Sequence, residues 1–163
     1  MAPLKRSLSC VTAAQLFVSS ISRPGDDTEA LVLSQDPLSL VSGRLGSAVS
    51  LQLRHQFRYV KEQEHRWHVS TVAYLYRLDN STGHELVSWH WHPATVAYPH
   101  LHVASGVLDK RVHLPTGRVS IESVLRMLLT DLDVAPAHDH AGDYLEVLEA
   151  SERPFIEHRR WHA

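Results

Sequence analysis

The chain has 163 residues, a formal net charge of −2 and a hydrophobic content of 44%. This length predicts a single domain with its own core, and the composition excludes wholesale disorder. A single cysteine, Cys10, excludes an internal disulfide framework, and we expect no disulfide-linked partner. Histidine is the unusual feature, because 13 of the 163 residues are of this type.

Residues 1–45 are expected to hold an N-terminal helix followed by an irregular segment. Lys5-Arg6 and the stretch after it resemble the start of a signal peptide, but Gln15 and several serines interrupt the apolar run. We therefore expect a cytoplasmic protein without a membrane span. The helix is predicted from apolar residues at spacings of three to four: Leu8, Val11, Ala14, Val18 and Ile21.

Residues 46–118 are predicted to form an antiparallel sheet. Apolar and polar residues alternate from Val49 to Tyr59, which is the period of a half-buried strand. His55 lies on the apolar side of that strand, so we expect it to be buried and hydrogen-bonded. Lys61-Glu62-Gln63-Glu64 is expected to be a hairpin loop. Further strands are predicted at 67–78, 85–92, 98–104 and 111–114.

Residues 119–163 are predicted to form C-terminal helices. Ser120 is a suitable N-cap for a helix whose apolar stripe runs from Ile121 to Leu132, and a shorter helix is expected over 144–150. Strands in one block with helices at both ends predict a single α+β domain. The sheet is thus expected to be flanked by the N-terminal helix and the C-terminal helices.

The charges are unevenly distributed along the chain. Residues 54–118 carry eight Lys and Arg against five Asp and Glu, with nine of the histidines. Residues 120–153 carry eight acidic residues against two arginines. The protein as a whole lacks the basic character of a nucleic-acid coat, whereas its basic, histidine-rich centre is compatible with phosphate chemistry.

Four histidines are predicted to gather on one face of the sheet. His90 and His92 alternate with tryptophans, and His100 and His102 alternate with apolar residues in the next strand. In an antiparallel hairpin, one register places His90 opposite His100. A shorter loop would place His92 opposite His100 and His90 opposite His102. Both registers bring the four imidazoles together, whereas a slip of one residue would separate them.

This cluster has two chemical interpretations. Imidazoles that titrate near neutral pH can divide general acid and base roles without any cofactor. Neutral imidazoles are also ligands for zinc, copper, nickel or iron. Arg54 and Arg58, on the polar face of their strand, would bind a phosphate group beside the cluster. The sequence leaves open whether Asp79 or Glu85 joins it.

Short motifs in the central part of the chain resemble a known family. They are Tyr76-Arg77-Leu78-Asp79-Asn80, then His84, then Tyr98-Pro99-His100-Leu101-His102-Val103, then a helix that begins at Ser120. Their order, over roughly residues 55–133, is similar to the TumE-like toxin components of bacterial toxin–antitoxin loci. The chain differs in having Leu78 where the family tends to have an aromatic residue, and in its added His90-Trp91-His92.

The resemblance implies a cytoplasmic toxin that an antitoxin protein neutralises, with RNA or translation as its target. Our leading hypothesis is therefore an endoribonuclease that uses His90, His92, His100 and His102 without a metal. The first alternative is a transition-metal-binding protein or metal-dependent hydrolase that uses the same four histidines as ligands. The second is a non-enzymatic interaction module, whose tryptophan-rich strands and acidic tail would contact a partner protein.

Overall fold

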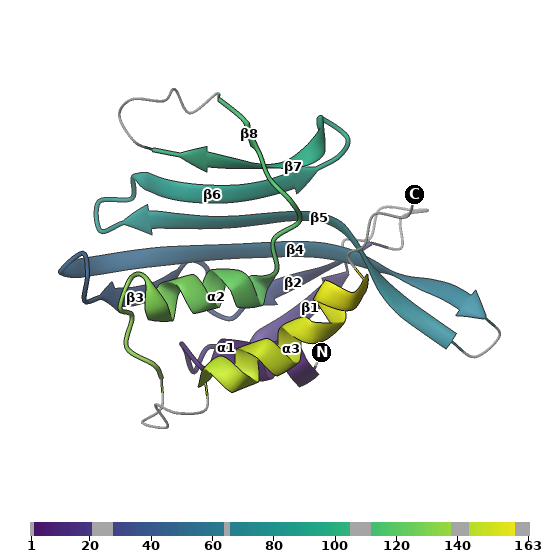
Figure 1. Ribbon diagram of the computed structural model, residues 1–163, viewed down its shortest axis with the longest axis horizontal. Coiled ribbons are helices and arrows are strands. Elements are labelled where there is room, and N and C mark those ends of the chain that lie inside the picture. Colours follow the sequence, from purple (N-terminus) through teal and green to yellow (C-terminus); the bar gives the residue numbers. More distant parts are fainter. Residues whose placement is uncertain (1, 21–27, 64–65, 105–111, 138–143, 159–163) are drawn as a thin grey trace.

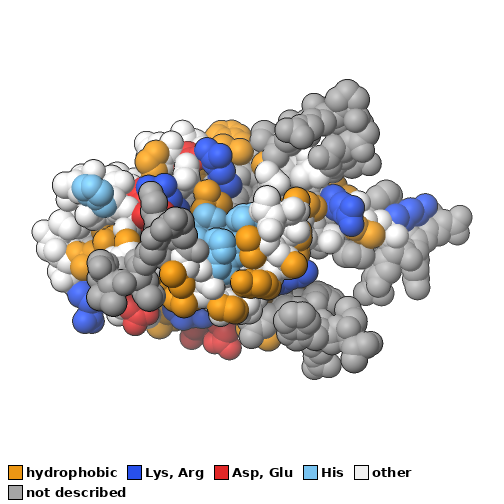
Figure 2. Space-filling view, turned by 90° about the horizontal axis from the view of Figure 1, so that it is seen from above, with side chains coloured by type: hydrophobic (Ala, Val, Ile, Leu, Met, Phe, Trp, Pro, Cys, Tyr) orange, Lys and Arg blue, Asp and Glu red, His pale blue; other side chains and the backbone are white. Residues whose placement is uncertain are grey.

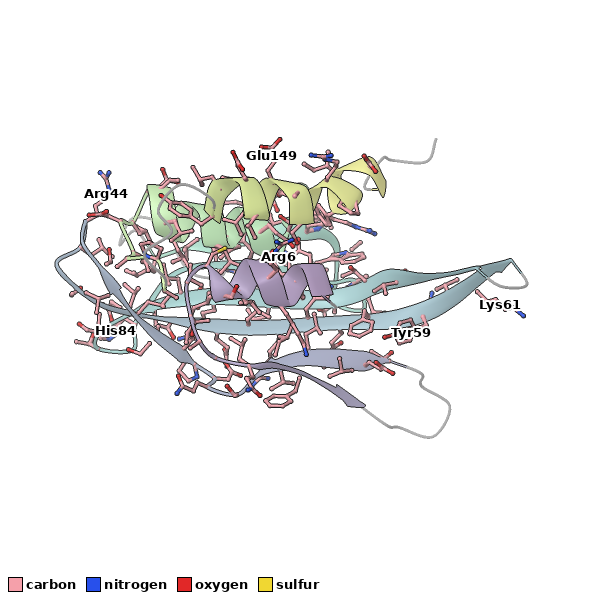
Figure 3. The ribbon with its side chains drawn as sticks, turned by 90° about the horizontal axis from the view of Figure 1, so that it is seen from below. Arg6, Arg44, Tyr59, Lys61, His84 and Glu149 are labelled. Atoms are coloured by element: carbon pink, nitrogen blue, oxygen red, sulfur yellow. The ribbon has the colours of Figure 1, made fainter. Side chains whose placement is uncertain are left out.

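An antiparallel eight-stranded sheet carries the helices on one face (Figures 1 and 3). The computed structural model describes residues 2–20, 28–63, 66–104, 112–137 and 144–158. The core lies between the sheet and the helices and includes Leu51, Tyr76 and Leu125, all fully buried. The predicted α+β class, with an antiparallel sheet flanked by helices from both ends of the chain, is confirmed.

The strands are joined largely in sequence order. In the sheet the order is β1-β2-β4-β5-β6-β7-β8, and β3 pairs with the same edge of β4 as β2 does. The elements are α1 (Ala2–Ser9), β1 (Leu16–Ser20), β2 (Glu29–Leu33), β3 (Leu38–Ser42), β4 (Ser47–Gln63), β5 (Arg66–Asn80), β6 (Glu85–His92), β7 (Val96–Val103), β8 (Leu114–Pro115), α2 (Ile121–Thr130) and α3 (Tyr144–His158).

The prediction for residues 1–45 is wrong in two respects. The N-terminal helix ends at Ser9, and Leu16–Ser20 form a strand that pairs with β2. The helical spacing of three to four residues did not decide the structure of this segment, because pairing with β2 holds it as a strand. The segment expected to be irregular contains β2 and β3. In β3, buried and exposed residues alternate, as in a strand with one face on the core.

Helix α2 begins as predicted, at Ser120. The Ser120 hydroxyl oxygen accepts a hydrogen bond from the Ser123 backbone N–H at 2.9 Å, which satisfies one donor of the first turn. Helix α3 is longer than expected and runs to His158. Its second half is tied to α2 because Glu152, which is buried, accepts a hydrogen bond from Ser120 (2.5 Å) and pairs with Arg126 (2.9 Å).

Strands β4 and β5 form a long hairpin that extends beyond the rest of the sheet (Figures 1 and 3). The loop expected at Lys61-Glu62-Gln63-Glu64 therefore starts later, because β4 continues through Gln63. Tyr59 and Lys61 lie on this extension, and both are exposed. Within the described residues, no helix has both the length and the apolar composition that crossing a membrane requires.

Candidate functional site

The pairing of β6 with β7 gathers the four predicted histidines on the sheet face opposite the helices. His90 lies opposite His100, which is the first of the two expected registers, and Ser88 lies opposite His102. Trp91 points to the other face, where it belongs to the core. The histidines are therefore grouped on one face, and Figure 2 shows histidine side chains together at the surface near β7.

His100 is at the centre of the cluster. It is fully buried, and its ring contacts all four of the other imidazoles. The distances between ring centroids are 5.4 Å to His90, 5.2 Å to His92, 5.1 Å to His102 and 4.5 Å to His113. The ring of His113 also contacts that of His102, with 4.8 Å between their centroids.

His113 is a member of the site that the sequence interpretation missed. The pairing of Pro115 with His100 places β8 beside β7, and His113, two residues before Pro115, then lies on the histidine face. A strand was predicted over 111–114, and its alternation was the signal that could have found this residue. The cluster thus draws imidazoles from β6, β7 and the residue preceding β8.

Three of these side chains form a group suited to a metal ion. One ring nitrogen each from His90, His100 and His102 lie within 4.8 Å of one another. Two nitrogens bound to one zinc ion in tetrahedral geometry lie about 3.4 Å apart, given bonds of about 2.0–2.1 Å. Binding of a metal ion would therefore have to draw the three nitrogens together by up to about 1.4 Å.

The hydrogen bonds of His100 leave one nitrogen without a partner. Its Nδ1 lies 3.1 Å from the backbone carbonyl of Tyr98, and a carbonyl can only accept, so Nδ1 carries the proton. The neutral ring then has its lone pair on Nε2, which is buried and has no hydrogen-bond partner among the residues that the structure describes. Metal-binding histidines commonly donate their second ring N–H to a carbonyl in this way.

His90 is connected to a carboxylate through a buried serine. Its Nε2 lies 2.8 Å from the Ser88 hydroxyl, and that hydroxyl donates to Glu85 at 2.5 Å. Of the two acids left open by the sequence, Glu85 therefore joins the cluster through Ser88. Asp79 instead binds Arg77 at 2.7 Å, and Arg77 also lies 3.7 Å from Glu85.

His92 sits beside an irregularity of the sheet. The register between β6 and β7 shifts after His90, so that His92 pairs with Val96. Its Nδ1 is hydrogen-bonded to the Thr95 hydroxyl in the turn that follows. Such irregularities re-aim side chains and are common beside functional sites.

The environment keeps the central imidazoles neutral. Burial, together with the nearby His102, His100 and His92, lowers the pKa of His90 to about 4. Burial is also the main cause that lowers the pKa of His100. Neutral rings at pH 7 offer lone pairs without competition from protons.

The two predicted phosphate-binding arginines lie at different distances from the cluster. Arg54 pairs with Leu75, which pairs with His90, so Arg54 shares the histidine face two strands away, about 10 Å between backbones. Arg58 pairs with Ser70, beyond the part of β5 that contacts β6, and about 13 Å further along β4. Both side chains are exposed.

Two other described histidines have separate roles. His84 is exposed in the turn between β5 and β6, where its Nδ1 bonds to Thr82, and it lies at the opposite end of the sheet from Lys61 (Figure 3). His55 contacts Tyr76 and Thr71 on the helix-covered face, which confirms that it is hydrogen-bonded there. The predicted His138-Asp139-His140 loop lies outside the described residues.

No family model, curated protein or solved structure matches this chain. The TumE-like resemblance thus stays a prediction, and function has to be argued from the geometry. Grouped imidazoles, one of them buried, can bind a transition-metal ion or transfer protons. His100 favours metal binding, because its Nδ1 donates to the Tyr98 carbonyl and leaves the lone pair of Nε2 available beside the other imidazoles.

Proposed function

We propose that the protein binds a transition-metal ion through His90, His100 and His102, with His113 as a further ligand. The observation that carries this proposal is the Nε2 atom of His100, which is buried beside three other imidazoles and has no hydrogen-bond partner within the described part of the chain. An unsatisfied buried nitrogen costs about 1–3 kcal/mol. A metal ion would use its lone pair and remove that cost.

The ligand chemistry selects the class of metal. Imidazole nitrogens suit zinc, copper and nickel, whereas magnesium and calcium prefer oxygen ligands. Three imidazoles with one open position form the ligand set of a catalytic zinc site, in which the metal activates a water molecule. Four would form a closed set. The coordination number therefore separates a metal-dependent hydrolase from a metal-binding structural protein.

The first test is the metal content of the wild-type protein, purified without a histidine tag. We expect about one equivalent of zinc, copper or nickel by elemental analysis, removable by a chelator and restored by titration with the metal salt. Magnesium and calcium should show no saturable binding. Less than about a tenth of an equivalent, together with no binding on titration, would contradict the proposal.

A second candidate function is RNA cleavage by a toxin that an antitoxin protein neutralises. Arg54 favours it, because this exposed guanidinium shares the face of the histidine cluster and could hold a phosphate group there. Imidazoles on the same face would supply the acid and the base, with no metal required.

This candidate predicts growth arrest when the chain is expressed alone in bacteria. Alanine at both His100 and His102 should relieve the arrest, whereas His84→Ala should not. RNA cleavage by the purified protein should persist in a chelator, because the imidazoles themselves would transfer the protons. Unimpaired growth at high expression would argue against a toxin, and loss of cleavage in chelator would favour the metal-dependent reaction.

A further inference from the structure

A continuous chain of hydrogen bonds leads from Glu85 to the histidine cluster. The Ser88 hydroxyl lies between the Glu85 carboxylate, at 2.5 Å, and the Nε2 atom of His90, at 2.8 Å. Ser88 is fully buried and lies opposite His102 in the neighbouring strand. Its hydroxyl is therefore inaccessible to a substrate, and its contacts are with Glu85 and His90.

Counting protons along this chain determines which nitrogen of His90 carries one. A serine hydroxyl has a single proton, and the ionised carboxylate of Glu85 can only accept. The Ser88 proton is therefore donated to Glu85, so the Ser88 oxygen must accept from His90. The Nε2 atom of His90 thus carries the ring proton, and its Nδ1 atom has the lone pair.

His90 and His100 are consequently held in opposite tautomers. His100 donates from Nδ1 to the Tyr98 carbonyl and keeps its lone pair on Nε2. His90 donates from Nε2 to Ser88 and keeps its lone pair on Nδ1. Each ring has its non-ligating nitrogen fixed by a partner on its own strand, which is how proteins orient metal-binding imidazoles.

We propose that Ser88, held by Glu85, is a positioning residue that fixes the tautomer of His90 and makes its Nδ1 atom a metal ligand. This inference rests on the proposed metal-binding function. Because Ser88 donates to Glu85, its oxygen is a stronger acceptor for the Nε2–H group of His90. This stronger hydrogen bond makes the Nδ1 atom of His90 a better metal ligand. Arg77 lies 3.7 Å from Glu85 and, bound to Asp79, helps hold that carboxylate in place.

The test is Ser88→Ala, which removes the hydroxyl but no ligand. We expect zinc affinity to fall about tenfold, since losing the partner of a metal-bound histidine costs about 10–100-fold. In the metal-free protein, two-dimensional ¹H–¹⁵N spectra of the imidazole rings should show His90 protonated at Nε2 in the wild type. In Ser88→Ala the two tautomers should be mixed.

A matched control is Ser42→Ala. Ser42 is also fully buried and donates to a backbone carbonyl, that of Leu132 at 2.6 Å, but it lies at the end of β3. It reports the cost of losing a buried serine hydroxyl, and it should leave zinc affinity and the His90 tautomer unchanged. If Ser88→Ala does not fold, Glu85→Leu provides the second variant, because Ser88 could then donate to His90 and reverse its tautomer.

The outcomes separate this inference from the proposed function. Wild-type zinc binding combined with an unchanged affinity and tautomer in Ser88→Ala would overturn the role of Ser88 and leave metal binding intact. A wild-type His90 protonated at Nδ1 would overturn it without any metal measurement. Absence of metal binding by the wild type would overturn the proposed function and, with it, the assignment of Nδ1 as a ligand.

Discussion

Replacing His100 by leucine is expected to weaken zinc binding at least about 100-fold and to stabilise the metal-free protein by about 1 kcal/mol. The two effects have one cause. His100 contacts every other imidazole of the cluster, so its loss removes the central ligand. Leucine has a similar volume and no polar atoms, so it also removes the cost of burying an unpartnered Nε2 atom.

The measurement combines zinc titration with urea unfolding in the presence of a chelator. His84→Leu is the matched control, because His84 is exposed at the turn between β5 and β6 and lies outside the cluster. That variant should bind zinc as the wild type does. Destabilisation of metal-free His100→Leu by more than about 1 kcal/mol would show that His100 contributes to folding rather than to a ligand site. Unchanged zinc affinity would place the metal elsewhere.

The histidines of β6 and β7 could be predicted from strand alternation and a hairpin. His90, His92, His100 and His102 lie in two strands joined by a short turn, so a period of two and a hairpin were enough to place them together. His113 could not be placed in the same way, because the strand predicted over 111–114 had alternation but no predicted partner or register. Ser88 and Glu85 have no sequence signature, since their role comes from hydrogen bonds along β6.

For the fold as well, elements set by local sequence could be predicted, whereas elements set by contacts distant in sequence could not. Helix α2 was predictable because its N-cap, Ser120, and its apolar stripe are both local features. The strand nature of Leu16–Ser20 was not, because it depends on pairing with β2, whose residues follow later in the chain. Helix α3 was predicted too short for a related reason, as contacts of Glu152 with α2 hold its second half.

His55 is expected to make the protein less stable in mild acid, by about 2 kcal/mol at pH 5 compared with pH 7.5. Burial lowers its pKa to about 4 from the ordinary value of 6.5. Its two ring nitrogens contact the hydroxyls of Tyr76, at 2.6 Å, and Thr71, at 3.1 Å. The folded protein therefore holds this ring in its neutral form.

The sign of the effect follows from proton uptake. Between pH 6.5 and 4 the unfolded chain binds a proton at His55 and the folded protein does not, so the free energy of unfolding decreases as the pH is lowered. Above pH 6.5 the ring is neutral in both states and the effect vanishes. Below about pH 4 both states are protonated, and no further loss arises from this residue.

His55→Gln isolates this contribution, because glutamine can bond to hydroxyl groups but does not titrate. Urea unfolding at pH 7.5 and 5, with a chelator present, should show a loss of stability on acidification about 2 kcal/mol smaller than in the wild type. The low pKa of His90 is common to both proteins and cancels in the comparison. His84→Gln, the exposed control, should keep the full wild-type loss. An equal loss in His55→Gln would refute the assignment, as would an NMR titration of the wild-type His55 ring with a midpoint near 6.5.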